Sequence, residues 1–229
     1  MTIGFLFILS SSCEKEIGKG TVTDIEGNAY QTIKIGNQWW MAENLKTTKY
    51  RNGDLIGTTI PATLNIMSEN NPKYQWAYDG NETNAATYGR LYSWHAVTDS
   101  RNVCPAGWHV PTDAEWHTLV LYLDSSALLT LYESTIAGGK LKEAGTAHWL
   151  SSNNGATNES GFTALPGGYR YVNGAFGYVG NCCKWWSSTE ASTNDGNALS
   201  RVLSDMDSSV GRDGYECKVG GLSVRCLRY

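Results

Sequence analysis

The chain has 229 residues, enough for one large domain or two small ones, and it can bury a core without help from metals or bridges. The net charge of −4 and the lack of a basic stripe argue against nucleic acid as a partner, and the apolar share of 41% argues against disorder. Nine Trp and 13 Tyr stand against four Phe, and such rings suit partly exposed surfaces because each joins an apolar body to a polar tip.

The first residues have the pattern of a targeting segment. The apolar run at 1–9 is too short to cross a bilayer as a helix, and three serines and Cys13 follow it. This is the layout of a bacterial lipoprotein signal, which is cleaved before the cysteine that carries the lipid. An ordinary secretory signal with a chance cysteine is the alternative, and both interpretations predict export. We therefore expect a signal peptide at 1–12, a lipidated Cys13, a tether at 13–20 and one domain at 21–229, held at the outer membrane of a bacterial cell envelope by the lipid alone.

Alternating apolar and polar residues predict strands at the start of the domain. Residues 21–35 indicate a hairpin around a Gly27-Asn28 turn, and 38–41 indicates a third strand. Three more segments follow in chain order: a continuation of the sheet at 44–50, an irregular surface loop at 54–73 and a short strand at 74–78.

The centre of the chain has helical periodicity. One helix is predicted at 89–98, and a second begins after Thr112, where Glu115 completes a capping box. A short helix is expected at 140–144. The buried face predicted for the second helix is formed by Trp116, Leu119, Val120 and Leu123.

The last third of the chain is rich in turns and strands. Residues 151–160 are polar, and Asn173-Gly174 is a hairpin signal. Two central helices framed by strands from both chain ends predict a single α+β domain. The expected strands lie at 161–165, 167–171, 175–179, 185–189, 198–204, 208–212 and 221–227.

Six segments look like the motifs of one protein family. In chain order they are 23–30 (TDIEGNAY), 35–45 (IGNQWWMAENL), 104–116 (CPAGWHVPTDAEW), 161–170 (GFTALPGGYR), 185–190 (WWSSTE) and 223–226 (SVRC). The family that they resemble is the Fibrobacter succinogenes major paralogous domain, which occurs in exported bacterial proteins. The resemblance covers about 21–229 and implies no particular enzymatic activity.

A weaker resemblance concerns the fold. The predicted helix at 89–98, the segment 110–116 and the closing 224–227 are similar to the formylglycine-generating enzyme family. That family has a C-type-lectin-like fold, with two helices, short antiparallel strands, long loops and terminal strands that lie together. The resemblance therefore implies a C-type-lectin-like α+β fold.

If Cys13 carries the lipid, five cysteines remain for disulfide bridges. Export to an oxidising compartment predicts that such bridges form. The resemblance implies a bridge between Cys104 and Cys226, since this fold places the last strand beside the helices. The lectin-like fold also implies a second bridge, from Cys217 to Cys182 or Cys183. We favour Cys183, which leaves the remaining thiol free.

Aromatic residues in adjacent strands of the second half suggest a ligand-binding face. Strand alternation places neighbouring tryptophans on opposite sides, so one enters the core and one is exposed. The ligand residues expected on this basis are Trp186 and Tyr171, with Glu190 and Asn158 accepting hydrogen bonds. The alternative is that the rings only build the core. The set as a whole is Tyr169, Tyr171, Tyr178, Trp185 and Trp186.

The spacing of the His, Cys, Asp and Glu residues predicts no metal site, and we expect no cofactor. Zinc spacings of the CxxC and HExxH kinds do not occur. The oxygen-rich loops 151–160 and 193–197 could supply ligands for calcium, although such loops are more typical of solvated turns. Thr193-Asn194-Asp195 only faintly resembles the Trp-Asn-Asp strand of calcium-dependent lectins.

No spacing pairs two carboxylates for hydrolysis, and we assign no catalytic residues. The sequence therefore favours a non-enzymatic recognition module for a glycan or protein ligand at the cell surface. A structural, self-assembling surface component of the fimbria kind is the alternative. An exported hydrolase or cysteine oxidase is the third hypothesis.

Overall fold

The computed structural model describes residues 18–150, 152–191 and 196–229. The expected signal peptide, Cys13 and most of the tether lie outside these residues, as does the Thr193-Asn194-Asp195 tripeptide. Within the described part of the chain, no helix has the length and apolar character needed to span a membrane.

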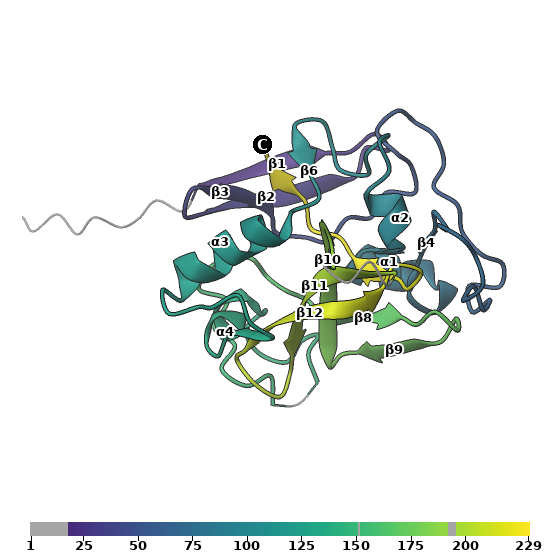
Figure 1. The fold of residues 1–229 in the computed structure, drawn as a ribbon. Helices are drawn as coiled ribbons and strands as arrows, with labels where there is room; N and C mark the ends of the chain where they lie inside the picture. Colours follow the sequence, from purple (N-terminus) through teal and green to yellow (C-terminus); the bar gives the residue numbers. More distant parts are fainter. Residues whose placement is uncertain (1–17, 151, 192–195) are drawn as a thin grey trace, which may run out of the picture.

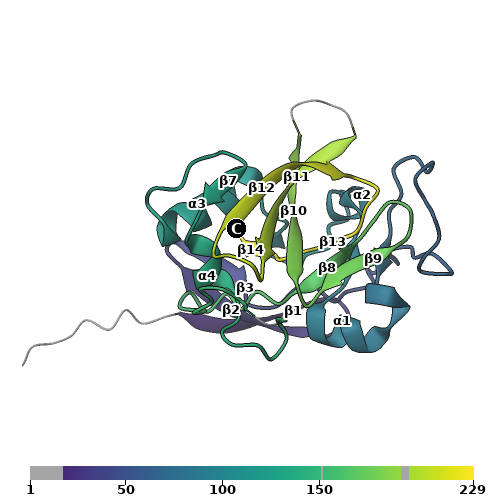
Figure 2. The ribbon, with the colours of Figure 1, turned by 90° about the horizontal axis from the view of Figure 1, so that it is seen from below.

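The described residues form a mixed α+β fold with two sheets (Figures 1 and 2). The first sheet has the strand order β1-β2-β3-β14-β6, so strands from both ends of the chain pair with each other. Its strands are β1 (Lys19–Thr23), β2 (Ala29–Ile35), β3 (Gln38–Met41), β6 (Trp108–His109) and β14 (Leu227–Arg228).

The second sheet has nine strands and contains the longest ones. Its main path runs β4-β5-β13-β10-β11-β12-β7, and the β8–β9 pair joins it at β10. Its strands are β4 (Gln75–Trp76), β5 (Leu91–Tyr92), β7 (Tyr132–Ser134), β8 (Gly167–Arg170), β9 (Phe176–Val179), β10 (Cys182–Glu190), β11 (Asn197–Ser204), β12 (Val210–Cys217) and β13 (Leu222–Ser223).

Four α-helices and one short 3-10 helix accompany the sheets. The longest helix is confirmed with its capping box: Thr112 Oγ1 accepts from Glu115 N, and Glu115 Oε2 accepts from Thr112 N at 2.8 Å. The helices are η1 (Tyr78–Gly80), α1 (Glu82–Tyr88), α2 (Trp94–Val97), α3 (Asp113–Leu123) and α4 (Ala137–Leu141).

The predicted first hairpin is confirmed, but its strands are joined by the loop 24–28 and not by a two-residue Gly27-Asn28 turn. β1 and β2 pair from Lys19 with Ile33 to Thr23 with Ala29. Asp24 Oδ1 accepts backbone hydrogen bonds from Glu26 at 2.9 Å and Asn28 at 3.0 Å, which closes the turn.

Near the centre, one expected helix is wrong, one helix was not expected, and the short helix expected at 140–144 lies earlier, as α4. The helix predicted at 89–98 is divided, because Leu91 and Tyr92 pair with β4 and β13 and only the four residues of α2 are helical. Helix α1 was not predicted; it begins after Asn81, whose side chain caps Thr83 N. Pairing across the sheet has overridden the local helical period at 91–92.

Three expected strands also differ. Residues 44–50 form no strand, because Leu45 N donates to Val224 O across the molecule instead. Residues 161–165 contribute only an isolated bridge between Ala164 and Lys142. The segment 221–227 is divided into β13 and β14, which belong to different sheets.

β10 separates two hydrophobic clusters. Trp186 is 0% exposed and lies in the cluster that contains Trp108 and Cys226, whereas Trp185 is 1% exposed and lies in the cluster of Trp40. The prediction that the two tryptophans face opposite sides is confirmed. The prediction that one of them is exposed is wrong, because core covers both faces of β10.

The bridge between Cys104 and Cys226 is confirmed, with Cα atoms 6.0 Å apart and 122 residues between them in the sequence. It lies in the cluster on the Trp186 face of β10. It joins the segment before β6 to the segment before β14, so it fixes the two strands that pair in the first sheet.

The bridge predicted between Cys217 and Cys183 is wrong. Strand β11 lies between β10 and β12; Cys183 pairs with Leu203, and Cys217 pairs with Asn197. These two β11 positions are six residues apart, which at the rise of a strand is about 20 Å, far beyond bridging distance. Both thiols are free, as is that of Cys182.

The free thiols should differ in reactivity. We expect iodoacetamide to label Cys217 in the native protein and to label Cys182 and Cys183 only after unfolding, as measured by peptide mass mapping without reduction. Cys217 is exposed, whereas burial raises the pKa of Cys182 to about 11 and that of Cys183 well above its usual value. Native labelling that persists in a Cys217→Ser variant would contradict this assignment.

Candidate binding surface

Three tyrosines gather where β8 and β9 pair. The rings of Tyr169 and Tyr178 are stacked, with centroids 5.3 Å apart and planes 8° apart. Tyr171 meets Tyr169 edge-on at 4.9 Å, and their hydroxyl groups are 3.1 Å apart. Tyr171 is 40% exposed and Tyr178 53%, while Tyr169 is partly covered. We call these three residues the tyrosine surface.

Lys184 of β10 borders the tyrosine surface. Its Nζ lies 4.8 Å from the centroid of the Tyr169 ring, a position that the negative ring face stabilises. The same ammonium pairs with Asp213 Oδ2 at 3.4 Å and with Glu216 Oε1, both on β12. One side of the sheet therefore offers aromatic faces together with an ammonium group and two carboxylates.

The backbone beneath these tyrosines is held in an unusual conformation. Tyr178 has φ of 66°, a left-handed conformation that costs a non-glycine residue about 1–3 kcal/mol. Gly168, also left-handed, lies where a Cβ atom would approach Gly177 O to 2.4 Å. Strain of this kind is often found at ligand-binding positions, where the surrounding structure maintains it.

Of the four predicted ligand residues, only Tyr171 belongs to the tyrosine surface. Trp186 is buried, and its Nε1 donates to Tyr92 O at 2.6 Å, so it presents no ring to a ligand. Its predicted surface role is therefore wrong, for the reason that β10 is a central strand with core on both sides.

The other two predicted ligand residues lie elsewhere. Glu190 stands at the far end of β10, six residues beyond Lys184, and pairs with Lys218 at 2.6 Å. Asn158 closes a turn: its Oδ1 accepts from Thr163 N at 2.9 Å, and its Nδ2 donates to Thr163 Oγ1 at 3.0 Å. The structure therefore does not bring these two residues to Tyr171.

The charged neighbours of the tyrosine surface were not predicted from the sequence. Strand alternation places Lys184 on the same face of β10 as Trp186, so it could have been predicted as a neighbour of the expected ligand residue. The partners Asp213 and Glu216 depend on the register of β10, β11 and β12, which the sequence did not reveal.

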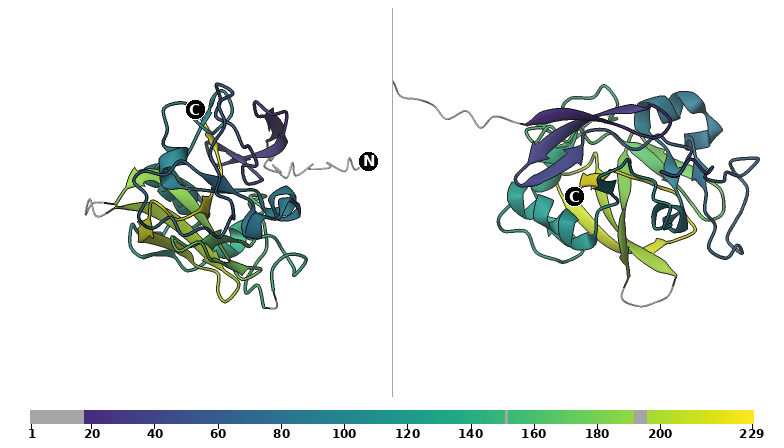
Figure 3. Two further views of the ribbon diagram at one scale, coloured as in Figure 1. Left: turned by 90° about the vertical axis from the view of Figure 1, so that its right-hand side faces the viewer. Right: turned by 90° about the horizontal axis from the view of Figure 1, so that it is seen from above.

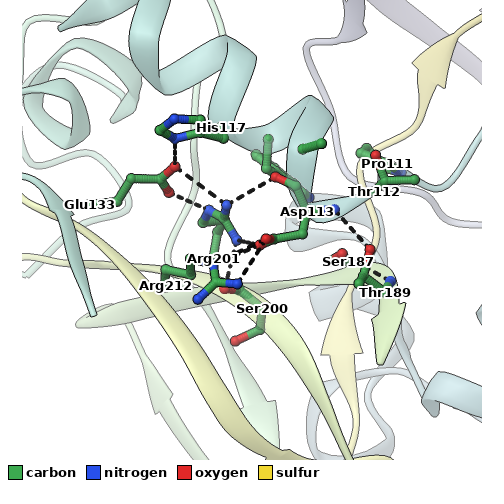
Figure 4. Close-up of polar contacts among 12 residues, drawn as sticks. Pro111, Thr112, Asp113, His117, Glu133, Ser187, Thr189, Ser200, Arg201 and Arg212 are labelled. Atoms are coloured by element: carbon green, nitrogen blue, oxygen red, sulfur yellow. Dashed lines mark hydrogen bonds and ion pairs between the residues drawn. The ribbon is translucent and has the colours of Figure 1, made fainter. Parts of the chain in front are cut away.

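A second charged group joins α3 to the other face of the sheet (Figure 4). Asp113 Oδ1 accepts from Arg201 Nη1 at 2.8 Å and from Arg212 Nε at 2.9 Å. Glu133 Oε2 pairs with Arg201 Nε at 2.6 Å, and Glu133 Oε1 is hydrogen-bonded to His117 Nδ1.

These charges satisfy one another. Burial raises the pKa of the Asp113 carboxyl, but hydrogen bonds from Arg212 and Arg201 outweigh it, so the net pKa is lowered. Arg201 and Glu133 are almost completely buried. The group fits a structural role, in which it fixes the start of α3 against β11 and β12.

Asn44 connects three distant segments. Its Oδ1 accepts from Trp185 Nε1 at 2.8 Å and from Arg225 Nε and Nη2 at 3.0 and 2.8 Å, and its Nδ2 donates to Tyr88 O at 2.8 Å. Arg225 is 1% exposed, and no carboxylate of the described chain lies within ion-pairing distance of it. Burial lowers the pKa of this guanidinium to about 9.

A cleft of about 350 Å³ opens beside Asn44. Glu43, Lys46, Tyr88 and Glu143 are among its lining residues. Glu43 Oε2 is buried and accepts no hydrogen bond from the described residues. The cleft is therefore a second place where a polar ligand group would find an available acceptor.

The described residues contain no cluster of three His, Cys, Asp or Glu side chains that could hold a metal ion. Calcium at 151–160 or 193–197 therefore stays an untested expectation, since residues 151 and 192–195 are outside the described chain.

Comparison with known families gives one match, the Fibrobacter succinogenes major domain, over residues 33–228. The chain belongs to this family. No curated protein and no solved structure matches it. In this Fibrobacter succinogenes major domain, the motif segments 35–45, 161–170, 185–190 and 223–226 all meet around Asn44, because Arg225 also donates to Phe162 O.

Replacement of Asn44 by Ala should destabilise the domain by about 3 kcal/mol or more, because it leaves a buried guanidinium and a buried indole N–H without their acceptor. The free energy of unfolding from urea titration measures this. Asn173→Ala is the matched control: Asn173 Oδ1 accepts from Ala175 N in an exposed turn, and the loss of this hydrogen bond should cost less than about 1 kcal/mol. Equal losses in the two variants would refute the role assigned to Asn44.

Proposed function

We propose that this domain is a non-enzymatic recognition module of the bacterial envelope, that it binds a glycan on the tyrosine surface, and that a lipid on Cys13 anchors it to the outer membrane. The observation that carries the proposal is the cluster of three tyrosine rings next to Lys184, in which Tyr171 and Tyr178 are exposed and both contact Tyr169.

The chemistry of a sugar suits this surface. A pyranose has C–H faces that pack on aromatic rings and hydroxyl groups around its edge that need hydrogen-bond partners. Tyrosine supplies both an apolar face and a polar tip. Lys184, Asp213 and Glu216 add one donor and two acceptor groups beside the rings.

The state of the other polar groups supports binding over catalysis. The charges of the α3 network neutralise one another, and the thiols of Cys182 and Cys183 have raised pKa values, so they hold little thiolate. A hydrolase or oxidase is therefore the weaker proposal.

We further propose that the fold is C-type-lectin-like. The pairing of β3 with β14 in one sheet, which brings the two chain ends together, supports this assignment. So does the loop-rich second half that carries the β8–β9 pair.

The tyrosine surface can be tested on a glycan array and then by calorimetry with the best glycan found. Tyr171→Ala and Tyr178→Ala should each weaken binding by about 5-fold or more, since truncation of an important side chain in an interface costs more than about 1 kcal/mol. Tyr215→Ala is the matched control, because Tyr215 is 79% exposed on β12, outside the tyrosine surface, and its loss should leave affinity unchanged.

Two other results would reject the proposed surface. Binding that is lost in Glu43→Gln but kept in Tyr171→Ala would place the ligand in the cleft beside Asn44. No glycan binding, together with concentration-dependent assembly in sedimentation experiments, would favour the structural, self-assembling alternative.

The lipid anchor has its own test. Replacement of Cys13 by Ala should move the protein from the membrane fraction to the soluble fraction, because cleavage and lipid attachment require the cysteine. Fractionation after expression of the full chain in a bacterium measures this. A variant that stays in the membrane fraction would disprove lipidation at Cys13.

A further inference from the structure

We propose that the end of the domain at which β1 begins rests on the bilayer, with an apolar group in and after α3 in contact with lipid. This inference rests on the proposed anchor at Cys13. The apolar group, which we call the leucine patch, consists of Leu121, Leu128, Leu129 and Leu131.

The leucine patch is unusually exposed for aliphatic side chains. Its members are 38%, 65%, 51% and 56% exposed in chain order, and they occur within 11 residues. Exposed apolar side chains that are concentrated in one segment are typical of contacts with proteins or membranes. The segment 118–132 holds one acidic residue, Asp124, which is buried and accepts from Ser134 Oγ at 2.6 Å, so this segment itself presents no exposed carboxylate to an anionic surface.

The anchor limits how far this domain can leave the membrane. Gly18 is already fixed to the first sheet, since its carbonyl accepts from Lys34 N at 2.9 Å. Gly18 is five positions after Cys13, and a fully extended chain over five residue steps spans at most about 18 Å. The part of the domain around Gly18 must therefore stay close to the lipid headgroups.

The leucine patch lies at this same end. The ring of Tyr122 in α3 packs against Gly36 in the turn between β2 and β3, next to the strand end at which the chain enters β1. Figure 1 and the right-hand view of Figure 3 both place the end of α3, the loop after it and the start of β1 at the left of the molecule. Lys19 and Lys34 are exposed at this end and would attract anionic headgroups.

A second copy of the chain or a soluble protein could also cover leucines. The bilayer is favoured because the tether itself brings it to this end, and because the two lysines complement its charge. The geometry therefore predicts a fixed orientation, in which the segment 54–73 at the opposite end points away from the membrane (Figure 1).

The test uses the full chain, expressed in a bacterium so that Cys13 is lipidated, with Cys217→Ser to remove the exposed thiol. Leu129→Cys is labelled with an environment-sensitive fluorophore, and the protein is reconstituted into vesicles of phosphatidylethanolamine and phosphatidylglycerol that carry a nitroxide near the top of the acyl chains. Met67→Cys, at a side chain 61% exposed in the segment 54–73, is the matched control.

We expect the nitroxide to remove about half or more of the emission at position 129, since a docked apolar surface lies about 5–10 Å deep, and to leave position 67 unchanged. Vesicle flotation reports the anchor separately. Protein that floats with the vesicles but shows no quenching at position 129 overturns the leucine-patch proposal and leaves the anchor intact. A blue shift of the emission at position 129 without quenching indicates that a second copy of the chain covers the leucine patch. Protein that does not float overturns the anchor, and the proposal with it.

Discussion

The domain depends on the hydrogen bonds that Asn44 makes to Arg225 and Trp185. A guanidinium that is completely buried without a carboxylate partner is costly unless each N–H finds an oxygen. Asn44 Oδ1 and the carbonyl of Phe162 provide those oxygens. Since these residues come from the segment after β3, from β10, from the loop before β8 and from the segment before β14, one polar centre ties both sheets together.

β10 carries that centre and divides the core. Its two tryptophans point to opposite sides, and each lies in a separate hydrophobic cluster. The bridge between Cys104 and Cys226 lies on one side, and α3 with its arginine–carboxylate network lies on the other. Both faces of the strand are therefore occupied by structure over most of its length. Only Lys184 near its start and Ser188, Thr189 and Glu190 at its end reach solvent.

We therefore expect ligand binding at the edge of the domain, where side chains are exposed, and not in its core. The tyrosine surface is built on the strained β8–β9 hairpin, which pairs with the start of β10. Helix α3 lies on the side of the molecule opposite the β8–β9 pair (Figure 2). A protein held to lipid at one end would leave the tyrosines available to a ligand, which is an arrangement that suits a tethered recognition module.

The sequence by itself determined the features that are set by neighbouring residues. These include the β1–β2 hairpin, strand β3, the capping box of α3, and the family, whose motifs are contiguous. The C-type-lectin-like resemblance also led to the bridge between Cys104 and Cys226. Only the tertiary structure decided the division of 89–98 into β5 and α2, the burial of Trp186 and the separation of Cys183 from Cys217, because each depends on which strand lies beside which. Alternation indicates that two side chains face opposite ways, but the number of layers packed around a strand decides whether either face meets solvent.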